Sequence, residues 1–148
     1  MVTAAPHVLM PTPRGALAGG LGALIYLPVM LLLQPTPFAQ MVFTVWPGVA
    51  PAAGEFLGWL LHVGLLVGMA IALAHLVRRV DDLRALLTAG LGWSFLTGWV
   101  VLFVAARMGL SLSLVGWGLE SAAHLINGLV VGAVLAYMHR LVPAVEAS

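Results

Sequence analysis

A chain of 148 residues with 62% hydrophobic and only 7% charged side chains cannot cover a water-soluble surface, for which about 25% charged residues is typical. The sequence contains no cysteine and no lysine, which excludes disulfides, iron–sulfur clusters and Schiff-base cofactors such as retinal. The formal net charge of +1 comes with six arginines that form no basic face, so nucleic acid is not an expected partner. The composition therefore predicts a single domain embedded in a lipid bilayer.

Four segments are long and apolar enough to cross a membrane, which takes roughly 20 residues of helix. They cover approximately residues 15–33, 53–77, 85–106 and 112–138. We therefore expect an all-α, polytopic integral membrane protein with four transmembrane helices in the cell inner (cytoplasmic) membrane. The first segment is interpreted as a span and not as a cleaved signal, because its apolar stretch is long and Pro37-Phe38-Ala39 is a poor cleavage site.

The predicted outer loop between the first two spans, Gln34–Ala52, contains an apolar stretch from Phe38 to Trp46 that is too short to cross. Unpaired backbone cannot face lipid. The stretch is therefore expected either to lie at the membrane interface, anchored by its aromatic residues, or to fold back as a cap over a binding site.

The second and fourth spans contain near copies of one segment, Gly64–His75 and Gly128–His139, at a constant offset of 64 residues. Such self-similarity indicates duplication, here of repeat units at about 15–80 and 83–142, so we expect two tandem helical hairpins. The second and fourth spans should then run in the same direction. Glycines four residues apart allow close helix approach, so we expect Gly64 and Gly68, like Gly128 and Gly132, to pack against neighbouring helices.

A second pair of glycines, Gly54 and Gly58, shares a face of the second span with His62. This pair lies about 120° from the Gly64–Gly68 pair by helical geometry. The second span is therefore expected to contact two neighbours.

The arginines predict the orientation. Five of the six lie in the N-terminal tail, the middle loop and the C-terminal tail, at Arg14, Arg78, Arg79, Arg84 and Arg140, against Arg107 alone in an opposite loop. By the positive-inside rule, both termini are expected to be cytoplasmic.

Few polar side chains fall inside the spans, and each needs a partner or a water-filled pocket. They are Glu55, His62, Glu120, His124 and Asn127. His62 and His124 each precede an arginine by 16 residues, which places both roughly 24 Å from the inner boundary at 1.5 Å per residue. Glu55 lies seven residues before His62, and Glu120 lies four residues before His124. Both spacings place the glutamate on the same helix face as the histidine. His75 and His139 are expected to be interface residues whose rings reach toward water.

Three interpretations of this group remain open. It is a hydrogen-bonded polar plug that fixes helix register, a cofactor site, or a proton or ion relay. In a cofactor site, His62 and His124 would bind haem, or Glu55, His62, Glu120 and His124 would bind a metal, with Asn127 nearby. The duplication does not relate the two histidines, because His62 aligns with Ile126 and His124 with Leu60.

Two segments resemble motifs of the YagU-like family of small four-helix bacterial and archaeal membrane proteins. They are Gly58-Trp59-Leu60-Leu61-His62 with the following Gly64 and Gly68, and His124 to Gly132 ending at Tyr137. Asn127 stands where the family has an aromatic residue. The resemblance implies a four-helix membrane protein and does not imply any particular activity.

For function, the leading expectation is a small non-catalytic membrane protein that acts as a subunit or accessory of a membrane assembly. Its partners would be the lipid bilayer and other membrane proteins or further copies of itself. The alternative is a haem- or metal-binding or proton- or ion-handling protein. A membrane enzyme ranks third, because the sequence contains no nucleophile–base pairing and no phosphate loop.

Overall fold

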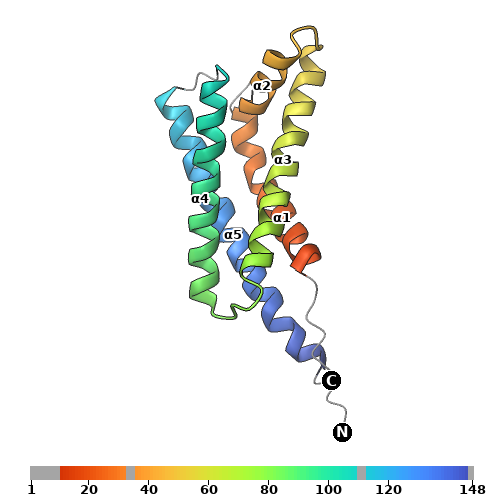
Figure 1. The fold of residues 1–148 in the computed structure, drawn as a ribbon, viewed down its shortest axis with the longest axis vertical. Helices are drawn as coiled ribbons and strands as arrows, with labels where there is room; N and C mark the ends of the chain where they lie inside the picture. The colour runs from red at the N-terminus through yellow and green to blue at the C-terminus, as the bar shows by residue number, and fades with distance from the viewer. Residues whose placement is uncertain (1–10, 33–35, 110–112, 147–148) are drawn as a thin grey trace.

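The computed structural model describes residues 11–32, 36–109 and 113–146, and the regular secondary structure in these ranges is helical. The helices are α1 (Pro11–Leu32), α2 (Pro37–Val45), α3 (Pro51–Leu76), α4 (Leu83–Arg107) and α5 (Leu114–Glu146). Figure 1 shows the four long helices lengthwise beside one another, with α3 and α5 running in the same direction. The all-α prediction is confirmed.

Three helical segments of the described chain are long and apolar enough to span a bilayer: Pro51–Leu76, Leu83–Arg107 and Leu114–His139. The chain therefore fits a membrane protein. Helix α1 is not one of these three, so the fourth span stays a prediction. Two helix ends also differ from the predicted ones, because α1 already begins at Pro11 and α5 continues to Glu146.

Local sequence signals explain where the helices begin and end. Pro37 and Pro51 lie in the first turns of α2 and α3, where a proline needs no backbone N–H and its fixed φ suits the helix. Thr36 and Asp82 cap α2 and α4 by accepting the N–H groups of Ala39 and Ala85 at 3.2 and 2.7 Å. After α4, Gly109 adopts a φ of 93°, the left-handed conformation that commonly ends a helix.

The helices associate as two pairs. Helix α1 packs on α3 and α4 packs on α5, while α1 also packs on α5 and so joins the pairs; α3 and α4 touch only slightly. Where α4 crosses α5, a Cβ atom on Gly90 would collide with the carbonyl oxygen of Gly128. Such close backbone approach is what small residues permit between helices in lipid.

The Gly54–Gly58 face of α3 is buried, as predicted, and α2 covers it. A Cβ atom at Gly58 would meet the backbone of Ala39, and one at Gly54 would meet the ring of Phe43. The predicted outer loop therefore contains a short helix that folds back onto α3 (Figure 1).

The prediction that Gly64 and Gly68 pack against a neighbouring helix is wrong for the described helices of this chain. Both are exposed, and no described atom would come within 4 Å of a Cβ atom at either position. The reason is that α1 meets α3 on another side, where Gly15 and Gly19 press against the backbones of Ile71 and Val67.

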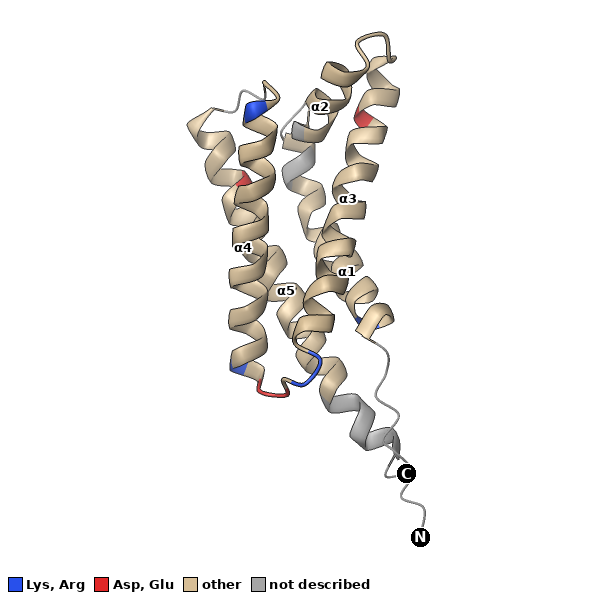
Figure 2. Ribbon diagram, viewed as in Figure 1, with Lys and Arg blue, Asp and Glu red and all other residues tan. Residues whose placement is uncertain are grey.

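Charged residues gather toward the ends of the bundle, with basic residues near the loop between α3 and α4 (Figure 2). That loop contains Arg78, Arg79, Asp81 and Asp82. The cytoplasmic location of this end stays a prediction from the positive-inside rule.

Candidate functional site: a buried Tyr–His–Glu cluster

Four polar or aromatic side chains from three helices meet inside the bundle. They are Tyr26 of α1, His62 of α3, and Glu120 and His124 of α5, with exposed fractions between 0% and 5%. We call this group the Tyr–His–Glu cluster.

Tyr26 is the centre of the cluster. Its hydroxyl donates a hydrogen bond of 2.8 Å to Glu120 Oε2 and lies 3.3 Å from the Glu120 carbonyl oxygen. Its ring lies edge-on to both imidazoles, with centroid distances of 4.6 Å to His62 and 5.0 Å to His124. The two imidazole centroids are 6.2 Å apart. One tyrosine therefore connects α1 to both α3 and α5.

The histidines belong to this cluster because of helix periodicity and close packing. His62 continues the buried face of Gly54 and Gly58, one turn further along α3. His124 lies against α4 at Gly98, where a Cβ atom would come within 2.5 Å of the imidazole ring. Glycine at position 98 therefore makes room for this ring.

Asn127, one turn further along α5, forms a second polar contact. Its amide Nδ2 donates to Ser94 Oγ of α4 at 3.3 Å. A Cβ atom at Gly22 of α1 would collide with Asn127 Oδ1, so α1 approaches α5 closely here. The Asn127–Ser94 contact therefore lies within the second hairpin, and the approach of Gly22 to Asn127 brings the first hairpin against it next to the Tyr–His–Glu cluster.

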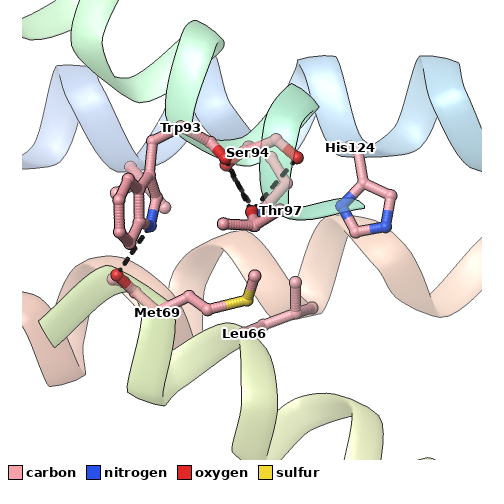
Figure 3. A pocket seen from close by; sticks show the side chains of 9 residues that line it. Leu66, Met69, Trp93, Ser94, Thr97 and His124 are labelled. Atoms are coloured by element: carbon pink, nitrogen blue, oxygen red, sulfur yellow. Dashed lines mark hydrogen bonds between the residues drawn. The ribbon is translucent and has the colours of Figure 1, made fainter. Parts of the chain in front are cut away.

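A small cavity lies beside His124 and Asn127, between α3, α4 and α5. Its volume is about 10 Å³ and its lining includes Leu66, Met69, Trp93, Ser94 and Thr97. Figure 3 shows Trp93 reaching from α4 to the backbone of α3, where its Nε1 donates to the Met69 carbonyl at 3.0 Å. The cavity has room for about one water molecule.

Several buried polar atoms in this region have no hydrogen-bond partner among the described residues: His62 Nδ1, His124 Nδ1, Glu120 Oε1 and Asn127 Oδ1. Leaving such a group unpaired costs about 1–3 kcal/mol. The cluster is thus tightly packed, yet its hydrogen-bonding capacity is only partly used.

The structure brings together some, but not all, of the site residues predicted from the sequence. His62, His124 and Glu120 come together, and Asn127 lies one turn away. Glu120 meets them through Tyr26, whose hydroxyl bonds to the carboxylate and lies near the carbonyl oxygen of Glu120. The plug interpretation allowed each imidazole to bond to the glutamate of its own helix. Among the described residues, Glu120 bonds to Tyr26 and Glu55 bonds to Thr36 instead.

Glu55 lies apart from the cluster. Its Oε2 accepts from the backbone N–H and the hydroxyl of Thr36 at 3.4 and 3.3 Å. Since Thr36 caps α2, Glu55 holds that short helix on α3. Helix α2 in turn reaches the cluster through Phe38, whose ring centroid lies 4.6 Å from that of His62.

Sequence reasoning missed Tyr26, Ser94 and Phe38. Tyr26 offered a signal, since a tyrosine within an apolar span needs a hydrogen-bond partner for its hydroxyl. Ser94 and Phe38 offered none, because a serine on a helix and a phenylalanine in a loop are compatible with many positions.

Neither predicted cofactor suits the arrangement. A haem would need a pocket of roughly 300 Å³ or more, whereas the cavity beside His124 holds about 10 Å³ and Tyr26 contacts both imidazoles. Within the described ranges, no group of three or more His, Cys, Asp or Glu side chains could hold a metal ion. We therefore assign no reaction step to a haem or a metal.

The two histidines of the duplicated segment lie at the end of the bundle where α1 begins. His75 Nε2 lies 3.2 Å from Thr12 Oγ1, and His139 Nδ1 lies 3.5 Å from Arg14 Nη1. His75 is exposed and His139 is half-buried. Both rings therefore tie α1 to another helix.

The chain matches no family model, no curated protein and no solved structure. The resemblance to YagU-like proteins stays a prediction, and function must be argued from this chain alone.

Proposed function

We propose that this chain is a small non-catalytic integral membrane protein that serves as a subunit or accessory of a membrane assembly. One observation carries the proposal. Gly64, Gly68 and Ala72 form a row of small residues four apart that is exposed on α3. The duplicated row in α5, Gly128, Gly132 and Ala136, is buried.

The buried copy shows how such a row packs. A Cβ atom at Gly128 would come within 2.5 Å of the Gly90 carbonyl oxygen, and one at Gly132 would come within 2.6 Å of the Leu86 carbonyl oxygen. The row in α5 therefore receives α4 backbone to backbone. Its copy in α3 has the same shape and has no described helix on it, so it offers a face for another transmembrane helix.

We expect the occupant to be α3 of a second copy. A two-fold axis along the membrane normal would place the same row of both copies face to face, as in glycine-based helix pairs. Large apolar side chains continue this face beyond the N-terminal end of the row, with Leu60 52% and Leu61 54% exposed, and would pack against the second copy there.

Cysteine cross-linking tests this proposal, since the chain contains no cysteine of its own. Leu61→Cys should form a disulfide-linked dimer in membranes, and adding Gly68→Leu should abolish it. Leu96→Cys on α4, at a similarly exposed site, serves as the matched control and should stay monomeric.

A dimer that forms equally at Leu61→Cys and Leu96→Cys, or that survives Gly68→Leu, would contradict α3 pairing. A cross-link from position 61 only to a different membrane protein would also contradict α3 pairing, because it would replace the second copy as occupant. With no adduct of either kind, the subunit proposal fails.

A second candidate, proton or ion handling, rests on the unpaired atoms of His62, Glu120 and His124. Chains of His and Glu inside a membrane are the usual material of proton relays. Liposomes containing the protein under a pH gradient test it: faster proton leak than in empty liposomes, lost in His124→Leu, would favour this candidate. Equal leak rates would reject it.

A further inference from the structure

A buried arginine lies near the beginning of α1. Arg14 is only 5% exposed, and its Nε has no hydrogen-bond partner among the described residues. Its Nη1 lies 3.5 Å from His139 Nδ1, and an imidazole cannot neutralise a guanidinium. A buried cation with no counter-ion among the described residues is costly, so this position favours an anion.

A narrow cleft opens beside Arg14 between α1, α3 and α5. The cleft has a volume of about 10 Å³, and the described residues that line it include two guanidinium groups, an imidazole and no carboxylate: Pro11, Arg14, Ala74, Val77, Arg78, Leu135 and His139. Asp81, in the α3–α4 loop, acts electrostatically on His139 but does not line the cleft. Arginine donors in a planar fork match the oxygens of a phosphate group.

Arg78 also lines a second, larger groove of about 740 Å³ on the side where α3 and α4 scarcely touch. Ala72, Leu76 and Trp93 form its apolar wall, and His75, Arg78 and Arg79 form its basic end. An apolar wall that ends in positive charge complements an anionic amphiphile.

We infer that this end of the bundle binds an anionic phospholipid. The phosphate group lies at the mouth of the narrow cleft, beside Arg14, Arg78 and His139, and an acyl chain follows the groove along Leu76 and Trp93. A lipid fits better than a free phosphate ion, because His139 ends an apolar span and the groove that shares Arg78 with the cleft offers an apolar wall that a free ion would not use.

Native mass spectrometry of the full chain in mild detergent tests the inference with three probes. These are dioleoylphosphatidylglycerol, dioleoylphosphatidylcholine and inorganic phosphate. The anionic lipid should bind at least about tenfold more tightly than the zwitterionic one, a difference of about 1.4 kcal/mol, which one charged hydrogen bond can supply. Inorganic phosphate should not displace it.

Arg14→Gln and Arg78→Gln should each reduce binding of the anionic lipid to the level of the zwitterionic one. Arg84→Gln, an equal loss of charge at an exposed site near the same end of the bundle, should change nothing. If Arg14→Gln fails to fold, Arg78→Gln alone tests the inference, because Arg78 is exposed and its substitution should leave the buried contacts intact.

Equal retention of both lipids by the wild-type chain would overturn the inference, as would an equal loss of binding in Arg84→Gln. Inorganic phosphate that binds in an Arg14-dependent way, without any preference between the lipids, would assign the site to a free anion and overturn the lipid.

Discussion

Tyr26 connects three helices in the interior of the bundle. It is fully buried, its hydroxyl joins α1 to α5 through Glu120, and its ring contacts an imidazole on α3 and another on α5. In lipid there is no hydrophobic force between helices, so packing and interhelical hydrogen bonds hold a bundle together. A residue that supplies both to two other helices fixes their relative positions.

Tyr26→Phe keeps the ring and removes only the hydroxyl. We expect the free energy of unfolding to fall by about 1 kcal/mol, the typical worth of a hydrogen bond between membrane helices. Unfolding in mixed detergent micelles measures it. Tyr137→Phe is the control, because Tyr137 is 63% exposed; an equal effect of both variants would remove the special role of Tyr26.

Gly98 tests how tightly His124 is held. Gly98→Ala should destabilise the bundle by roughly 1–3 kcal/mol through overpacking, because the added Cβ atom would come within 2.5 Å of the imidazole. Gly92→Ala on the same helix should have no such cost, since none of the described residues lies within 4 Å of a Cβ atom there. Equal stabilities of the two variants would contradict the packing at His124.

At the scale of helices, the two copies of one segment have different surroundings. The copy in α5 receives α4, whereas the copy in α3 is exposed, because α1 packs on a different side of α3. Nearly identical rows of glycine therefore do not by themselves decide which helix packs where. The difference comes from the partner helix, since α4 carries Gly90 opposite the row and α1 packs through Gly15 and Gly19 instead.

A matched pair of substitutions separates the two rows. Gly132→Leu should lower the free energy of unfolding by roughly 1–3 kcal/mol, because the new side chain would run into the backbone of Leu86 and Leu87. Gly68→Leu should leave the stability of the isolated chain unchanged. Thermal unfolding in monomeric detergent complexes compares them, and a large loss in Gly68→Leu would show that its face is covered within the chain.

At the scale of the whole molecule, the two helix pairs meet mainly through α1 and α5, and the side between α3 and α4 stays open. Polar contacts reinforce the joined side through Tyr26 and Glu120. On the open side, the bond from Trp93 to the Met69 carbonyl bridges the gap. The bundle is therefore closed around the Tyr–His–Glu cluster, while α3 and α4 scarcely touch along one flank.

Topology is a property of the whole chain and can be tested directly. Reporter fusions after Ser148 and near Pro47 should report opposite sides of the membrane, with Ser148 in the cytoplasm, because five of six arginines lie on the predicted inner side. A reporter after Ser148 that is active outside the cytoplasm would refute the orientation. If both reporters lie on the same side, the predicted three spans between Pro47 and Ser148 would be refuted.

The sequence alone was sufficient for the class of fold and for much of the site. Composition and apolar length predict membrane helices, and helix periodicity places His62 with Gly54 and Gly58 on one buried face. Equal distance from a terminal arginine predicts the shared depth of His62 and His124, whose rings lie 6.2 Å apart. These features follow from local geometry along one helix and from the exclusion of polar groups from lipid, both of which are readable from spacing.

Only the tertiary structure decided which faces meet. Glu55 and Glu120 have similar positions in the sequence pattern, yet one holds α2 through Thr36 and the other binds Tyr26. The exposed Gly64–Gly68 row and the buried Gly128–Gly132 row are likewise near copies. The sequence of one helix determines how closely a neighbour can approach it. Which helix packs there, and on which side, depends on the packing of all the helices together.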